Sequence, residues 1–178
     1  MQFENENTEF KARLSDEIYK EVIAFANTDG GVIYLGIDDD GSIIGLDNVD
    51  ETYTRLTNGI RDAIQPDVTM FVRYVLQENR VIRVEVGEGS YKPYYLKSKG
   101  KETGTYIRIS GTSRPAGPEK IKELEMEGAR ISWDELTCID YPVEEKAIEQ
   151  LCKDIATYRE RAGLPKREIT EVQLLNWM

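Results

Sequence analysis

The chain has 178 residues and a mass of 20.4 kDa, and 40% of its residues are hydrophobic, which is enough for one core domain and a small appendage. It contains no histidine and only two cysteines, which excludes histidine-based catalytic triads, imidazole metal sites and a disulfide framework. No apolar stretch approaches the roughly 20 residues that span a bilayer. We therefore expect a cytoplasmic protein without a membrane segment.

The net charge of −10 argues against a surface that is positive throughout. The charge is unevenly distributed, because residues 92–122 hold eight Lys or Arg and two Asp or Glu, a balance of +6. The rest of the chain has a balance of −16. One basic segment can therefore form a local positive patch on an acidic protein.

The first 28 residues predict an extended segment followed by a helix. Residues 4–10 are acidic and polar, and we expect a short edge strand or an extended arm. A helix is predicted over 15–28, because Ser15 can cap it, acidic residues follow in the first turn, and apolar residues recur at helical spacing.

A turn and a buried strand follow the helix. The turn contains Asn27, Gly30 and Gly31, which are residue types that reach positive φ and end helices, and we assign these three a structural role. The apolar run over 32–37 is rich in β-branched and aromatic residues, as a central strand requires. After an acidic turn, residues 42–45 are predicted to start a second strand.

The middle of the chain predicts a helix and a hairpin. The helix covers 51–64 and ends before Pro66. Strands are expected over 68–75 and 81–86, and the alternation of charged and apolar residues in the second strand indicates that one face is wet.

The basic segment interleaves tyrosines and lysines over 91–101. Such a composition suits nucleic acid, because rings stack on bases and ammonium groups contact phosphates. An exposed loop with a partly packed tyrosine cluster is the alternative. A strand is expected over 105–109, and the small residues of 110–114 form either an anion-binding nest or a plain loop. The candidates for nucleic-acid contact are Lys92, Lys97, Lys99, Lys101, Arg108 and Arg114.

The C-terminal part has a different character. A helix is expected over 118–128, and an amphipathic helix over 143–162. A capping-box pattern from Thr170 predicts the start of another helix. We therefore divide the chain into a domain of residues 1–128 and a helical extension of residues 129–178, which is expected to begin a further domain such as a winged helix.

Four motifs occur in a specific order. They are Glu-x-x-x-x-Glu-Phe-Lys from Glu4, Ala-Phe-Ala-Asn-Thr-x-Gly-Gly from Ala24, Gly-Ile-Asp-Asp from Gly36, and Tyr-x-Arg with a small-residue loop from Tyr106. Together they resemble the Schlafen AlbA_2 family, also described as a DNA-binding or divergent AAA-4 domain, over residues 4–127. The resemblance implies a nucleic-acid-binding module of a bacterial or archaeal transcriptional regulator.

The resemblance also implies a catalytic hypothesis. Family members with ribonuclease activity use two glutamates and an aspartate, and these match Glu4, Glu9 and Asp38 here, with Asp39 as an alternative third residue. Clustered carboxylates hold Mg²⁺ or Mn²⁺, which activates water and stabilises the transition state. An extended strand places Glu4 and Glu9 on opposite faces, so they converge only if the chain bends. No Gly-x-x-x-x-Gly-Lys-Ser/Thr motif is present, and we reject ATP hydrolysis.

The sequence therefore predicts an α+β fold. A mixed or antiparallel sheet of about five or six strands is covered by helices, and a small helical extension follows. The favoured function is the binding of DNA or RNA. The alternatives are a metal-dependent endoribonuclease, with Mg²⁺ or Mn²⁺ as its cofactor, and a protein–protein or dimerisation module, including a homodimer.

Overall fold

The computed structural model describes residues 5–130, 144–165 and 170. The chain divides into two compact units, 1–135 and 136–178. The domain boundary predicted after residue 128, and the hypothesis that residues 129–178 begin a further domain, stay predictions.

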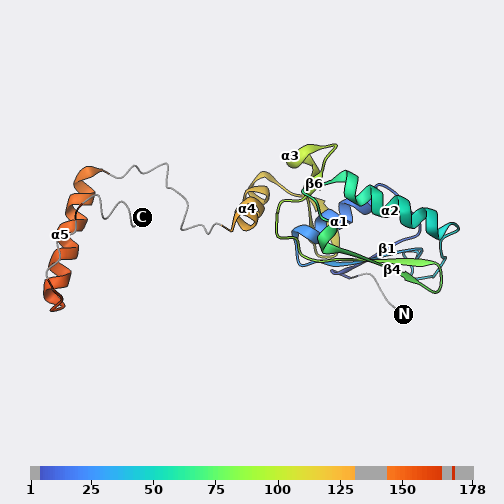
Figure 1. Ribbon diagram of the computed structural model, residues 1–178, viewed down its shortest axis with the longest axis horizontal. Coiled ribbons are helices and arrows are strands. Elements are labelled where there is room, and N and C mark those ends of the chain that lie inside the picture. The colour runs from blue at the N-terminus through green and yellow to red at the C-terminus, as the bar shows by residue number, and fades with distance from the viewer. Residues whose placement is uncertain (1–4, 131–143, 166–169, 171–178) are drawn as a thin grey trace. The chain divides into compact units, whose positions relative to one another are not determined.

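The largest sheet of the first unit has four strands in the order β1-β2-β5-β4 (Figure 1). The strands are β1 (Thr8–Lys11), β2 (Gly31–Leu35), β4 (Val72–Gln77) and β5 (Val81–Val86). β1 and β2 are parallel and are joined by helix α1 (Glu17–Asn27), because parallel neighbours need a long crossover connection. The other pairs are antiparallel, so the sheet is mixed.

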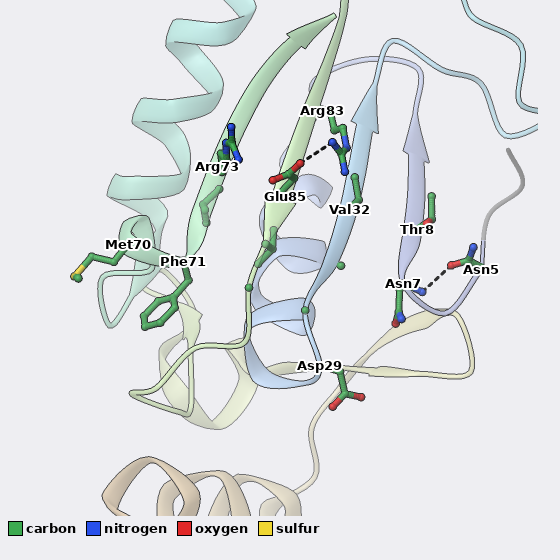
Figure 2. Close-up of a pocket in the computed structure, with 15 residues that line it drawn as sticks. Asn5, Asn7, Thr8, Asp29, Val32, Met70, Phe71, Arg73, Arg83 and Glu85 are labelled. Carbon is green, nitrogen blue, oxygen red and sulfur yellow. Dashed lines mark hydrogen bonds and ion pairs between the residues drawn. The ribbon is translucent and has the colours of Figure 1, made fainter.

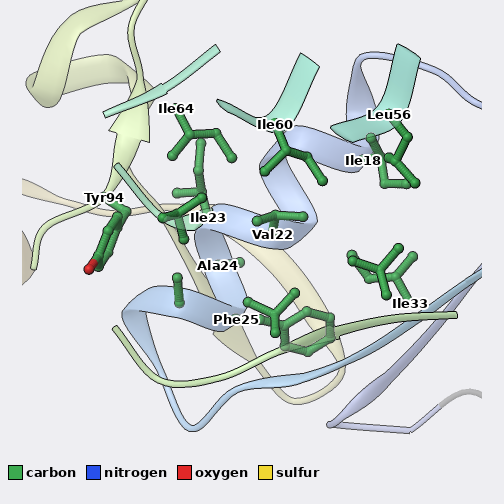
Figure 3. Close-up of a cluster of buried hydrophobic side chains, with 14 of the residues drawn as sticks. Ile18, Val22, Ile23, Ala24, Phe25, Ile33, Leu56, Ile60, Ile64 and Tyr94 are labelled. Carbon is green, nitrogen blue, oxygen red and sulfur yellow. The ribbon is translucent and has the colours of Figure 1, made fainter. Parts of the chain in front are cut away.

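The main core lies between this sheet and two helices, α1 and α2 (Val49–Ala63), which cover the same face of the sheet (Figures 1 and 3). The buried side of α1 follows from its helical spacing of apolar residues. It packs with Leu56 and Ile60 of α2 and with Ile33 of β2. A smaller cluster on the opposite face of the sheet includes Phe10 and Tyr34, whose rings meet edge to face.

The remaining elements surround this core. The two-residue strands β3 (Ile64–Gln65) and β6 (Tyr95–Leu96) pair with each other, and η1 (Thr69–Phe71) precedes β4. A short helix α3 (Gly100–Gly104) leads into the hairpin of β7 (Tyr106–Ile109) and β8 (Thr112–Pro115). Helix α4 (Pro118–Ala129) then packs on Ile107 of this hairpin.

The α+β class is confirmed, with a mixed sheet, covering helices and a C-terminal helix. Among the residues that the structure describes, the strands are distributed over three sheets, of four, two and two strands, instead of being joined in one.

Two local predictions were wrong. The strand expected over 42–45 is a tight loop with one isolated bridge between Ile37 and Ile43, because the backbone N–H groups of Ile44 and Gly45 both donate to the carbonyl of Gly36. The loop expected over 110–114 is a hairpin. Its turn consists of Ser110 and Gly111, both at positive φ, which is the conformation that two-residue hairpin turns require.

The second unit contains helix α5 (Glu145–Arg161), which agrees with the helix predicted over 143–162. Its apolar residues Ile148, Cys152 and Ile155 are only half-buried. The helix predicted from Thr170 lies outside the described residues, except for Thr170 itself. Within the described ranges, no helix is long and apolar enough to cross a membrane.

Candidate functional site

A buried polar cluster forms around Arg108 of β7. Its guanidinium Nη2 donates to Oε2 of Glu9 on β1 at 2.7 Å, and its Nη1 donates to Oε2 of Glu21 on α1 at 2.8 Å. The side chain of Arg108 is 5% exposed, and those of Glu9 and Glu21 are 12% exposed. Arg108 therefore joins three elements of the fold through buried ion pairs.

The remaining donors of Arg108 bind the N-terminal turn. Nε donates to the carbonyl of Glu6 at 3.2 Å, and Nη2 also donates to the carbonyl of Asn5 at 3.4 Å. The guanidinium carbon lies 4.8 Å from the centroid of the Phe25 ring, within the range of a cation–π contact. These contacts hold the segment that precedes β1 against the β7–β8 hairpin. We name the group of Arg108, Glu9 and Glu21 the Arg108 clamp.

Two further residues complete the hydrogen bonding of the two carboxylates. The Ser113 hydroxyl of β8 donates to Oε2 of Glu21 at 2.5 Å, and Lys11 Nζ donates to Oε1 of Glu9 at 2.5 Å. The Ser113 side chain of the small-residue hairpin thus binds a carboxylate of the protein itself, and the anion nest considered for residues 110–114 stays a prediction.

Burial raises the pKa of the Glu21 carboxyl above its ordinary value of 4.5, and the nearby charge of Glu9 acts in the same direction. The Ser113 bond and the Arg108 charge oppose this rise without cancelling it. Sequence reasoning missed Glu21. Its position, three residues after Ile18 and four before Phe25, places a charge within the buried stripe of α1, and this was the available signal.

The three carboxylates of the catalytic hypothesis have different surroundings. Glu4 lies outside the described residues. Both oxygens of Glu9 already accept bonds from cationic side chains, which leaves them poorly disposed to a metal ion. Asp38 is exposed in the loop after β2, where its Oδ1 accepts a bond from the N–H of Asp39 at 3.0 Å. Within the described part of the chain, no three Asp, Glu or Cys residues are grouped closely enough to hold a metal.

Two other basic candidates are bound to carboxylates. The side chain of Lys92 is 8% exposed, and its Nζ lies 2.8 Å from Glu88 and 2.9 Å from Glu127 of α4. Burial alone lowers the pKa of Lys92, but the bonds to these two glutamates outweigh that effect and raise it. Lys101 pairs with Glu125 of α4, and this bond raises the pKa of Lys101. With Arg108, three of the six candidates therefore have ion pairs inside the domain.

The other three candidates are exposed. Lys97 and Lys99 lie on the turn between β6 and α3, and Lys99 Nζ lies 3.1 Å from the hydroxyl of Tyr106. Arg114 lies opposite Ile107 in the β7–β8 register. Arg114 lies on the face of the hairpin that carries Ile107, whereas Lys99 contacts Tyr106, the neighbour of Ile107 in β7. Because neighbouring residues of a strand point to opposite faces, Arg114 and Lys99 lie on different sides of the hairpin. The nucleic-acid role of all six residues stays a prediction.

Asn27, Gly30 and Gly31, in the turn after α1, each have a different structural role. Asn27 is 2% exposed and makes no positive-φ turn: its amide donates to the carbonyls of Tyr94 and Tyr106 and accepts from the N–H of Tyr94. Gly30 has a φ of +76°, as expected of a glycine turn. Gly31 has no positive φ, but a Cβ there would lie 2.3 Å from the ring of Phe25.

A shallow depression of about 910 Å³ lies over the end of the sheet (Figure 2). Arg83 Nη1 pairs with Glu85 at 2.6 Å, and Arg73 is opposite Glu85 in the strand register. With Asp29 on the rim, positive and negative side chains balance. This depression therefore offers little net attraction to a polyanion, in spite of its two arginines.

Comparisons with known proteins give the following matches. The chain matches the family described as Schlafen, AlbA_2 over residues 4–117. Its structure is similar to that of the DIP2311 protein from Corynebacterium diphtheriae, with 19% sequence identity and a TM-score of 0.51. That match covers 96% of this chain and 32% of the other, so this chain spans about a third of that protein's length.

A second similar structure is the N-terminal domain of a RecG-related protein from Nitrosomonas europaea. It has 23% identity and a TM-score of 0.41, and the match covers 61% of this chain and 80% of the other. At such identities, structural likeness shows the fold alone. No curated protein matches the sequence.

Proposed function

Because this chain belongs to the Schlafen AlbA_2 family, we propose that its domain of residues 1–128 is a nucleic-acid-binding module of a transcriptional regulator, with DNA as the first ligand to test. The contact surface is the turn that carries Lys97 and Lys99, with Arg114 as a more distant contact. The proposal concerns this module, since the chain spans about a third of the similar Corynebacterium protein.

The observation that supports this surface is which basic residues form salt bridges inside the domain and which do not. Lys92, Lys101 and Arg108 are paired with carboxylates of the domain, whereas Lys97 and Lys99 are exposed and form no salt bridge with any described residue. The charge of Lys97 acts on Asp62: the pKa of Asp62 is lowered by its hydrogen bond from Arg61 and, to a smaller extent, by Lys97. Two ammonium groups without a carboxylate partner among the described residues, on one turn, suit a phosphate backbone.

The test is fluorescence anisotropy with duplex DNA, single-stranded DNA and tRNA over a series of salt concentrations. The double variant Lys97→Ala/Lys99→Ala should weaken binding to every sequence. It should also reduce the slope of log K against log salt concentration by about two, because each lost phosphate contact removes slightly less than one.

The matched control removes the same charge from the second unit. Lys146 and Lys153 are exposed on α5, and Lys146→Ala/Lys153→Ala should leave affinity and slope unchanged. Equal affinity and slope for Lys97→Ala/Lys99→Ala and the wild type would eliminate the proposed surface.

A further inference from the structure

The two edges of the four-stranded sheet differ in how they are covered. At the β1 edge, Arg108 of the β7–β8 hairpin binds the carbonyls of Asn5 and Glu6 as well as Glu9. At the β4 edge, no strand of the described residues pairs on the outer side. Uncovered edges are templates for pairing with another chain, unless a protein protects them.

The hydrogen-bond pattern shows which backbone groups of β4 face outward. The N–H of Gly87 donates to the carbonyl of Phe71 at 2.7 Å, in register with the β4–β5 pairing. Since hydrogen-bonded and non-bonded pairs alternate in an antiparallel ladder, Arg73, Val75 and Gln77 bind β5. Val72, Tyr74 and Leu76 therefore face outward, and the N–H of Val72 already donates to Thr69 of η1. Among the described residues, the outward backbone groups left without a backbone partner are the C=O of Val72 and the N–H and C=O of Tyr74 and Leu76.

The side chains give this edge little protection. β4 has no proline and no lysine, and its only charged residue is Arg73. The side chain of Leu76 is 54% exposed, which is a large exposure for an apolar residue of a strand. Tyr53 of α2 is also exposed, and the centroid of its ring lies 5.8 Å from that of Tyr74. Proline and lysine are therefore absent from β4, and the single charge of Arg73 is the only such protection within this strand.

We propose that β4 pairs with β4 of a second copy of this chain, in antiparallel orientation, around a two-fold axis that passes through Val75. In this register, Tyr74 of each copy lies opposite Leu76 of the other. The N–H and C=O groups of both residues then bind each other, and each exposed Leu76 packs against a tyrosine ring. The outward backbone groups are thus complementary to themselves.

Neighbouring two-fold registers fit less well. An axis at Tyr74 would place Leu76 opposite Val72, whose N–H is already bonded, and the carbonyl of Leu76 would lack a donor. An axis at Arg73 would place two guanidinium groups opposite each other, which is unfavourable. The register centred on Val75 instead places Arg73 opposite the uncharged Gln77.

This association is independent of nucleic-acid binding, and its first test is sedimentation equilibrium of the whole chain up to millimolar concentration. The wild type should show a monomer–dimer equilibrium that strengthens with added salt, because two chains of net charge −10 repel each other. Leu76→Lys should weaken dimerisation at least about tenfold. The control Leu164→Lys places the same charge at an exposed leucine of the second unit and should have little effect.

The register is tested at Gln77. Gln77→Glu should strengthen dimerisation, since it faces Arg73 of the other copy, although it adds negative charge to an acidic protein. Gln77→Lys should weaken it, although it reduces the net charge. A wild type that stays monomeric, a dimer indifferent to Leu76→Lys, or equal effects of Gln77→Glu and Gln77→Lys would each overturn the proposal.

Discussion

Removal of the Arg108 guanidinium should be the most destabilising single change in the Arg108 clamp. Arg108→Ala leaves Glu9 and Glu21 close together beneath the hairpin without their shared cation. Arg108 is almost completely buried, and both glutamates are nearly so. The substitution also removes the donors to the Asn5 and Glu6 carbonyls, so the N-terminal turn loses its attachment to β7.

Breaking a buried ion pair by removing one partner typically costs about 3–5 kcal/mol, because the remaining charge is desolvated and uncompensated. The lost contact with the Phe25 ring adds about 1 kcal/mol. Lys11 still neutralises part of the charge of Glu9, so the lower end of the range is expected. Since domains of this size have about 5–15 kcal/mol of stability, the variant should fold but be strongly weakened.

The assay is urea unfolding followed by circular dichroism at neutral pH, with the change in midpoint converted through a common m-value. Arg114→Ala is the control, because Arg114 is an exposed arginine on the neighbouring strand, and it should change stability by less than about 0.5 kcal/mol. Replacing Arg108, Glu9 and Glu21 together with methionine should recover much of the loss. A loss below about 1 kcal/mol for Arg108→Ala would refute the reasoning.

Three further predictions concern stability. Asn27→Ala should cost about 3 kcal/mol in urea unfolding, because it leaves buried backbone groups without partners; the exposed substitution Asn58→Ala should be nearly silent. Gly31→Ala should lower the melting temperature by several degrees, because its Cβ would overlap the Phe25 ring and each kcal/mol is about 2–4 °C for a chain of this size. Gly87→Ala, whose Cβ would make only an ordinary contact at 3.6 Å with the carbonyl of Phe71, should not lower it. Because the pKa of Glu21 is raised in the folded state, the protonated form favours folding. The stability of the wild type relative to Glu21→Gln should therefore fall as pH rises from the ordinary value of 4.5 toward the raised pKa, and a flat difference in urea midpoints across that range would contradict this.

The elements of the fold could be predicted because their signals are local. The apolar stripe of α1 and the β-branched run of β2 specify a helix and a buried strand from short windows of sequence. The strand expected over 42–45 failed because the N–H groups of Ile44 and Gly45 both bind the carbonyl of Gly36, which closes a tight loop after a single bridge from Ile43 to Ile37. The β propensity of two residues does not reveal such a local hydrogen-bond pattern.

The candidate site could be predicted less well. The sequence gives the net charge of a segment, whereas ion pairs join residues that are far apart in the sequence. The segment 92–122 is basic in sequence, but Lys92 and Lys101 bind glutamates of α4, and Arg108 binds Glu9 and Glu21. The four motifs include Glu9 and Arg108, without indicating that these two residues bind each other. Only the three-dimensional arrangement reveals that pairing.

The Arg108 clamp has a consequence for biosynthesis. The bond from Arg108 to Glu9 joins residues 99 positions apart, and the bond to Asn5 spans 103. At ribosomal rates, on the order of ten seconds separate the synthesis of these two parts. During that interval the nascent chain carries β1 with an open edge, and Glu9 and Glu21 lack the guanidinium of Arg108. Closure therefore has to wait for the β7–β8 hairpin to leave the exit tunnel, and a ribosome that stalls before residue 108 would present an unfinished, pairing-competent sheet to chaperones.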